Sequence, residues 1–259
     1  MGVVSSGIVV EEEQIFDVNS GLTVLDTQVN EYGTLNVNSG GVASSTTVNQ
    51  DGYFYVNNGG VASITTVTCA EFVVNSGGVA INTTANDWAN FYVNPGAVAS
   101  SVNMGGTTPY LKVSSGGKLT GSMTFGADAQ LSLEAGAILD FDISAQAPGA
   151  GALVNNLSKV SSSPTYTITV DANQTEGTYA LAAGAAGFAG TLTLGSAEAA
   201  YGTITVNGDA LSYGDYTYTL TLSGEGALNL DVASSGGAVP TSSGAVITVG
   251  AYAARTRPN

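Results

Sequence analysis

The chain has 259 residues, of which 44% are hydrophobic and 10% charged, and its 20 acidic and 5 basic side chains give a net charge of −15. The hydrophobic fraction excludes wholesale disorder. The acidic balance excludes nucleic acid as a partner, because no basic stripe is present to neutralise phosphates. No run of 18 apolar residues occurs, so we expect no transmembrane helix and no membrane insertion.

A short phrase ending in Asn-Ser-Gly, or in a variant of it, returns along the first half of the chain. The phrase recurs in steps of 19, 19, 18, 19, 20 and 20 residues, and its anchor position falls at Asn19, Asn38, Asn57, Asn75, Asn94, Ser114 and Glu134. A fixed period in this range is the signature of a solenoid. Each repeat also holds two short alternating segments that are typical of strands, such as Phe54–Asn57 and Thr46–Asn49.

A coil of this length cannot bury its apolar side chains alone, so successive coils must stack and share one core. We therefore predict an all-β fold in which residues 1–148 form a parallel β-helix, or solenoid. Glycine pairs such as Gly40-Gly41 are expected to supply positive φ at the turns. Asparagines at equivalent turns are expected to form a ladder in which each amide bonds its copies above and below. The ladder residues are Asn19, Asn38, Asn57, Asn75 and Asn94.

The repeat decays after Gly136, and residues 149–259 are predicted to form a β-rich C-terminal module. This module can be a small antiparallel sandwich or a cap that covers the last strands of the solenoid. An Asn207-Gly208 pair predicts a hairpin between Thr203–Val206 and Asp209–Leu211. The candidate strands are Thr165–Val170, Thr178–Leu181, Gly190–Leu194, Gly202–Val206, Tyr216–Leu222 and Ala227–Val232.

The end of the chain has a different composition from the rest of this module. Residues 233–245 are rich in Ser and Gly and are predicted to be a linker. Val246–Tyr252 is a candidate last strand, and residues 253–259 are predicted to be a tail.

The residue types that support most catalysis and metal binding are scarce. The chain has no histidine and one cysteine, Cys69, so imidazole-based triads and thiolate zinc sites are excluded. Asp140 and Asp142 share a face of a predicted strand and are candidates for an acid/base pair or a Ca²⁺ site. The alternative for this pair is a solvated strand face at the end of the solenoid. We predict no catalytic residue, no metal site and no cofactor.

Aromatic side chains near the repeats have two interpretations. Tyr53, Tyr55, Trp88, Phe91 and Tyr92 are candidates for an aromatic platform that binds sugars. The phenylalanine of the repeated phrase is instead expected to stack in the core, while tyrosines at the alternate positions point outward.

The phrase Val-Asn-Ser-Gly-Gly-Val-Ala followed by Ser-Ser-Thr-Thr-Val-Asn, at Val37–Asn49, resembles the AIDA-type repeat of autotransporter adhesin passengers. Further copies occur at Val56–Val67 and Val74–Ala85. The resemblance implies a parallel β-helix exported to the bacterial surface, where such repeats mediate adhesion to host cells or between bacteria. It also implies O-glycosylation by a glycosyltransferase, with Ser39, Ser44, Ser45, Ser76 and Ser101 as candidate acceptors.

The sequence therefore favours a non-catalytic adhesin or passenger fragment, secreted or displayed on the bacterial cell surface. Its expected partners are host-cell or bacterial surface molecules, or further copies of itself. Two alternatives stay open. One is a structural subunit whose exposed end coils stack between chains into fibres. The other is a carbohydrate-active β-helix enzyme that uses Asp140 and Asp142.

Overall fold

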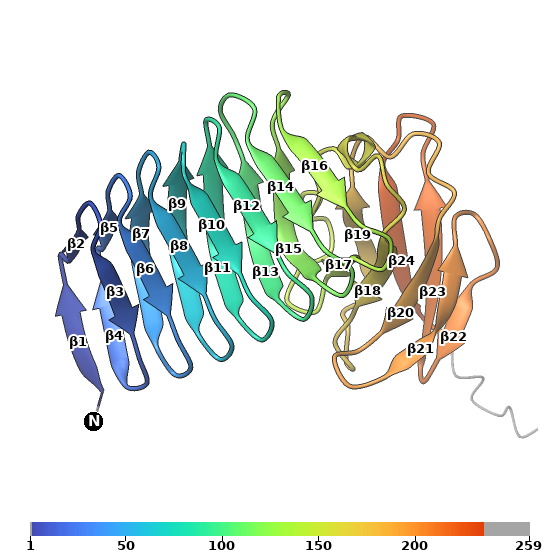
Figure 1. Ribbon diagram of the computed structural model, residues 1–259. Coiled ribbons are helices and arrows are strands. Elements are labelled where there is room, and N and C mark those ends of the chain that lie inside the picture. The colour runs from blue at the N-terminus through green and yellow to red at the C-terminus, as the bar shows by residue number, and fades with distance from the viewer. Residues whose placement is uncertain (1, 236–259) are drawn as a thin grey trace, which may run out of the picture.

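The computed structural model describes residues 2–235, and in this part of the chain almost all regular structure is β. Figure 1 shows short strands stacked in coils along a rod, with the chain running from the N-terminus at one end to a group of antiparallel strands at the other. The all-β parallel solenoid predicted from the repeat is confirmed. A single turn of 3₁₀ helix, η1 (Leu157–Lys159), interrupts the β-structure of the described residues.

The longer wall of the solenoid is a 13-stranded sheet, called sheet A. Its strands are β1 (Val3–Ser6), β2 (Val9–Val10), β4 (Leu22–Leu25), β5 (Gln28–Val29), β7 (Val42–Val48), β9 (Val61–Thr68), β11 (Val79–Asn86), β13 (Val98–Met104), β15 (Lys118–Phe125), β17 (Ile138–Asp142), β18 (Thr165–Thr169), β20 (Thr191–Gly195) and β21 (Ala200–Thr205). All neighbours pair in parallel except β20 and β21.

The facing wall is a seven-stranded sheet, sheet B, in which every pairing is parallel. Its strands are β3 (Ile15–Val18), β6 (Thr34–Val37), β8 (Tyr53–Val56), β10 (Glu71–Val74), β12 (Asn90–Val93), β14 (Tyr110–Val113) and β16 (Gln130–Leu133). Equivalent residues of successive repeats are paired, for example Phe54 with Phe72 and Phe72 with Phe91.

This register places like residues on like residues inside the rod, as the alternation within each strand requires. Phe54, Phe72 and Phe91 are fully buried and stack with ring centroids 4.8 and 4.9 Å apart. The expectation that the phrase phenylalanines form a stacked core is confirmed for these three, whereas Phe16 of the first copy is only partly buried. One cluster of buried apolar side chains runs from Val10 to Val232, so the core continues past the last clear repeat.

The long strands of sheet A bend at a residue with positive φ. The bend residues are Asp26, Ser45, Ile64, Asn82, Ser101 and Gly121, with φ between 50° and 70°. In the first two coils the bend separates β1 from β2 and β4 from β5. In the later coils one strand continues through the bend, as in β7, β9, β11, β13 and β15. From β7 to β15, each repeat therefore has one strand in sheet B and one bent strand in sheet A, which begins with Val-Ala-Ser in β7, β9 and β13.

The two glycines of each turn serve different purposes. Gly40 has a φ of 72°, a conformation that costs little only without a Cβ. Gly41 does not have positive φ, but a Cβ there would collide with the carbonyl oxygen of Val18 in the preceding coil. Gly41 is thus required by the close approach of these two coils, whereas the turns at Gly96 and Gly136 accommodate an alanine, Ala97 or Ala137, at the second position.

A column of buried threonines lies just after the bend. Thr27, Thr46, Thr65 and Thr83 are at most 1% exposed, and their hydroxyls have no hydrogen-bond partner. The next coil places Val102 at the same position of the register. A buried hydroxyl without a partner loses its hydration and gains nothing in exchange.

We expect Thr65→Val to raise the free energy of unfolding by about 1 kcal/mol, because valine keeps the shape and removes the unpaired hydroxyl. Thermal or urea unfolding measures the change. Thr66→Val is the matched control, since this neighbour lies on the outer face and is half-exposed. A lower stability of Thr65→Val than of the parent protein would contradict the expectation.

The C-terminal part combines the end of sheet A with a separate four-stranded antiparallel sheet. The antiparallel strands are β19 (Gly177–Ala182), β24 (Leu228–Ser234), β23 (Tyr216–Leu222) and β22 (Leu211–Tyr213). Strands β18 and β20 instead extend the parallel order of sheet A beyond β17. The division of the chain into domains at residues 148 and 149 stays a prediction.

The hairpin predicted at Asn207-Gly208 is wrong. The turn itself forms, with Asn207 at a φ of 52° and the Gly208 amide donating to the Thr205 carbonyl. The flanking strands do not pair with each other, because β21 pairs with β20 and β22 pairs with β23. The predicted strand at Val246–Tyr252, the tail and all of the predicted linker beyond residue 235 lie outside the described residues.

No helix among residues 2–235 is long and apolar enough to cross a membrane.

Candidate functional site

The predicted asparagines lie in one column at the turn after each strand of sheet B. Each Nδ2 donates to the Oδ1 of the asparagine one coil earlier, at distances of 2.8 to 2.9 Å. The structure thus brings Asn19, Asn38, Asn57, Asn75 and Asn94 together in a continuous amide chain. How much the chain contributes to stability stays a prediction.

We expect Asn57→Ala to lower the free energy of unfolding by about 1–3 kcal/mol, because it removes two ladder hydrogen bonds at about 0.5–1.5 kcal/mol each. Asn19→Ala is the control, since Asn19 ends the ladder and takes part in one such bond. Chemical denaturation of both variants measures the difference. Equal effects at the two positions would show that the ladder does not act as a chain.

The five candidate glycosylation serines lie at two kinds of position. Ser39 and Ser76 are exposed in the turns that follow β6 and β10. Ser44 and Ser45 lie on β7 and Ser101 on β13, and all three are half-buried. Ser45 and Ser101 are bend residues with positive φ, and Ser44 accepts a hydrogen bond from Ser63 one coil later. Their modification stays a prediction.

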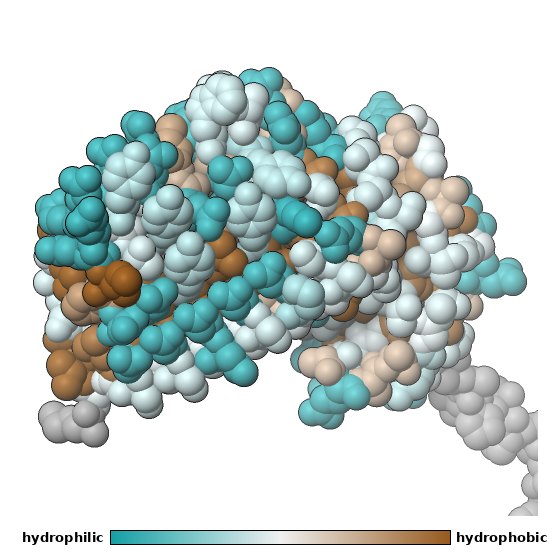
Figure 2. Space-filling view, in the orientation of Figure 1, coloured by the Kyte–Doolittle hydropathy of each residue, from teal (hydrophilic) through white to brown (hydrophobic). Residues whose placement is uncertain are grey.

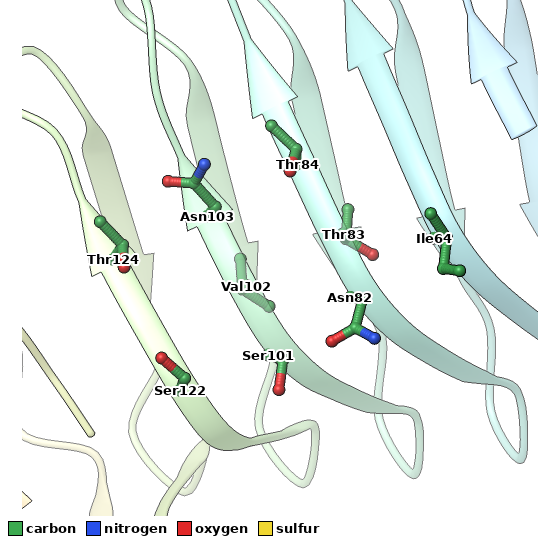
Figure 3. A pocket seen from close by; sticks show the side chains of 9 residues that line it. All are labelled: Ile64, Asn82, Thr83, Thr84, Ser101, Val102, Asn103, Ser122 and Thr124. Carbon is green, nitrogen blue, oxygen red and sulfur yellow. The ribbon is translucent and has the colours of Figure 1, made fainter. Parts of the chain in front are cut away.

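A shallow groove of about 410 Å³ crosses the outer face of sheet A over β9, β11, β13 and β15. Figure 3 shows two rows of side chains in it. Asn82 and Ser101 lie at the bend and Ser122 comes directly after it, while Thr84, Asn103 and Thr124 lie further along the strands. The register shifts between β13 and β15, so that Val102 faces Met123 and β15 carries an additional residue at the bend. Amides and hydroxyls line the groove, together with Ile64, and no charged side chain does.

The candidate carboxylates Asp140 and Asp142 do not form an exposed pair. The expectation of a solvated strand face is wrong for Asp140, whose side chain is completely buried. Lys118 lies 2.8 Å from its Oδ2, and hydroxyls of Thr120, Thr167 and Thr169 donate to its carboxylate at 2.7 to 3.1 Å.

These contacts engage both oxygens of Asp140, so it has no free acceptor to act as a base on a substrate. Asp142 is half-buried and accepts hydrogen bonds from the backbone and hydroxyl of Ser144. The Asp140 contacts join three neighbouring strands, β15, β17 and β18. Sequence reasoning missed this cluster, because Thr167 and Thr169 lie outside the repeats.

The outer face of sheet B carries aromatic side chains. We name Tyr53 and Tyr55 of β8, Tyr92 of β12 and Tyr110 of β14 the tyrosine face, and all four are half-buried. Tyr92 and Tyr110 meet edge to face, with centroids 6.2 Å apart. Phe91, which was also a candidate for the sugar-binding platform, is buried in the core and is not part of this surface.

Charged groups beside the tyrosine face are paired. The Tyr55 hydroxyl donates to Glu71, and Lys112 lies 2.9 Å from Glu134. The pKa of Tyr55 is raised to about 12, mainly by burial and secondly by the Glu71 carboxylate. Burial is also the main cause that raises the pKa of Tyr92. The hydrogen bond from Lys112 lowers the pKa of Glu134. Tyr55 and Tyr92 are therefore neutral at physiological pH and keep their hydroxyl protons.

No group of three or more acidic or cysteine side chains that could hold a metal ion occurs among residues 2–235.

The class of protein is defined by the strand pairing. The described chain is a parallel β-solenoid with coils of about 19 residues, to which an antiparallel sheet is joined.

Comparison with known proteins gives matches among solved structures alone. No protein-family model matches the chain, and no curated protein sequence matches it. Among solved structures, the chain is similar to a crystal structure of a TibA fragment that was hyperglycosylated in a reaction catalysed by TibC. The identity is 20%, the TM-score is 0.37, and the match covers 74% of this chain and 86% of that chain.

Proposed function

We propose that this chain is a non-catalytic passenger segment of a bacterial adhesin, secreted or held at the cell surface, that mediates adhesion to cells or matrix or between copies of itself. The AIDA-type phrase at Val37–Asn49 and its further copies supports this role. The solenoid supports it physically, because a rod of stacked coils needs no disulfide or bound metal for its core.

The observation that carries the proposal is the repetition of small uncharged side chains on the outer face of sheet A. Register pairing aligns Thr47, Thr66, Thr84, Asn103 and Thr124 in one row across five coils. A rigid row of hydroxyls and amides offers many equivalent hydrogen-bonding groups to a partner. Many weak contacts made together give an avidity that no single contact provides.

A glycosyltransferase is the second proposed partner. In the similar structure, TibA is glycosylated by TibC. Ser39 and Ser76 are the favoured acceptors in this chain, because both lie exposed in turns where an enzyme can reach them. Co-expression with a glycosyltransferase of this kind, followed by peptide mass spectrometry, tests the assignment. Sugar found only at other positions, or on no serine, would contradict it.

Binding of the purified chain tests the adhesin proposal. We expect labelled protein to bind epithelial cells, bacterial cells or immobilised matrix, or to associate with itself. Thr84→Glu with Asn103→Glu places two charges in the sheet A groove and is expected to weaken that binding. Ser20→Glu with Asn58→Glu adds the same charge at exposed turns and serves as the control. Binding to none of these targets would count decisively against the proposal.

The fibre alternative is favoured by one feature of the first coil. Val3, Val4, Val9 and Ile15 are 45 to 69% exposed. Figure 2 shows the corresponding brown patch at the N-terminal end of the rod, beside hydrophilic side chains. Apolar side chains beside unpaired strand edges are suited to stacking against another β-coil. End-to-end filaments that lengthen with concentration would favour a structural fibre subunit, whereas side-by-side association of rods is the self-binding expected of the adhesin.

A further inference from the structure

The tyrosine face is a surface that the adhesin proposal does not use. It lies on sheet B, whereas the groove and the hydroxyl row lie on the outer face of sheet A. Figure 2 shows pale, ring-shaped side chains across the front of the rod, over the strands of sheet B labelled in Figure 1. Two further aromatic residues flank it at the neighbouring corner, Tyr32 at 48% and Trp88 at 64% exposure.

We propose that the tyrosine face binds an extended, neutral polysaccharide laid along the rod across successive coils. Aromatic rings stack on the apolar faces of pyranose rings and are large and rigid, so they lose little entropy on binding. The rings here project from a parallel sheet, which holds them more firmly than a loop would.

The register fixes the spacing of the rings. Tyr55 and Tyr92 occupy the same position on β8 and β12, with Val73 of β10 between them. Neighbouring strands lie about 4.8 Å apart, so these two rings are separated by roughly twice that distance along the rod. A pyranose in an extended chain advances by about one coil spacing, so alternate sugars meet Tyr55 and Tyr92. Tyr110, one coil further, supports the edge of the Tyr92 ring.

The surrounding groups favour a neutral ligand. Glu71 accepts a hydrogen bond from the Tyr55 hydroxyl and places a negative charge beside that ring. Glu134 pairs with Lys112, so no free cation is left beside the described rings to attract a polyanion. The net charge of −15 adds repulsion of anionic chains. Asn90 lies between Glu71 and Tyr110 in the register, where its amide can bond sugar hydroxyls.

Affinity electrophoresis in gels that contain a soluble polysaccharide tests the proposal with the intact chain. Neutral probes are hydroxyethyl cellulose, arabinoxylan, galactomannan and dextran, and alginate is the polyanionic probe. We expect at least one neutral probe to retard the protein. Each of Tyr55→Ala and Tyr92→Ala should weaken binding roughly tenfold, because a stacked ring is lost.

The matched variants separate stacking from folding and from a general surface effect. Tyr55→Phe and Tyr92→Phe keep the rings and should retain binding. Tyr213→Ala removes a 46% exposed tyrosine of β22, away from sheet B, and should leave binding unchanged. The proposal is overturned if no neutral probe retards the protein, if only alginate does, or if a variant that combines Tyr55→Ala with Tyr92→Ala binds like the parent.

The result of the polysaccharide test is independent of the adhesin proposal. Loss of polysaccharide binding with cell binding intact would remove only the inference about sheet B. Polysaccharide binding without any cell, matrix or self-binding would remove only the adhesin role.

Discussion

Asp140→Ala is expected to lower the free energy of unfolding by about 2–4 kcal/mol, because the buried carboxylate is the common acceptor for Lys118 and three threonine hydroxyls. Removing it leaves the hydroxyls of Thr167 and Thr169 without these partners. Lys118 is 34% exposed and can turn toward water, which keeps the loss below that of a fully buried pair. Chemical denaturation of the intact chain measures the change.

Asp142→Ala is the matched control for this cluster. Asp142 lies two residues further along β17, on the same face, and its side chain bonds only Ser144. We expect it to cost less than about 1 kcal/mol, as is usual for a partly exposed position. If the two alanine variants are equally stable, the Asp140 contacts do not hold the junction of β15, β17 and β18.

Phe72→Ala should lower the free energy of unfolding by about 3–5 kcal/mol, the usual range for truncating a buried aromatic ring. Phe72 is the central ring of the stack and contacts Phe54 on one side and Phe91 on the other. Since coils share one core, the cavity weakens the contact between three coils rather than one. Thermal and urea unfolding, followed by circular dichroism, measure the effect.

Phe72→Leu and Val73→Ala are the controls for the Phe72→Ala result. Phe72→Leu should cost less than the alanine change, because Leu35 and Leu111 fill the same register position in other coils. Val73→Ala changes an outward, half-exposed side chain of the same strand and should change stability by less than about 1 kcal/mol. A Phe72→Ala variant no less stable than Val73→Ala would argue that the coils do not share a stacked core.

The solenoid could be predicted because the signal is repeated. One coil is an ambiguous pattern of alternating residues, but the same phrase at Asn38, Asn57 and Asn75 fixes both the period and the register. Register then places the asparagine amides within hydrogen-bonding distance of one another. The same argument places Phe54 on Phe72 without any information on distant contacts.

The bends of sheet A could not be predicted, because their residues carry no common signal. Ser45, Ile64 and Asn82 adopt positive φ although none is a glycine, and isoleucine is among the residues least suited to it. Parallel ladders on both sides of each bend hold the backbone there. Local propensity is outweighed by tertiary pairing, so Thr46–Asn49 was predicted as a separate strand where one bent strand, β7, occurs.

The sites outside the repeats depend on pairings that the sequence does not reveal. Asp140 and Asp142 were recognised as neighbours on one face, but the burial of Asp140 is set by Thr167 and Thr169 on β18. The Asn207-Gly208 turn was recognised, yet its flanking strands β21 and β22 pair with β20 and β23 instead of with each other. The repeat period predicts which residues pair only as far as the repeats extend along the chain.

Small-angle X-ray scattering over a protein concentration series tests the central claim, that the chain is a single solenoid rod with its binding surfaces along the outside. We expect an elongated particle with the mass of one chain at low concentration and a scattering curve that matches stacked coils. Scattering from a compact sphere would contradict the solenoid. Particles that lengthen end to end even at the lowest concentration would contradict the adhesin passenger and establish the fibre subunit instead.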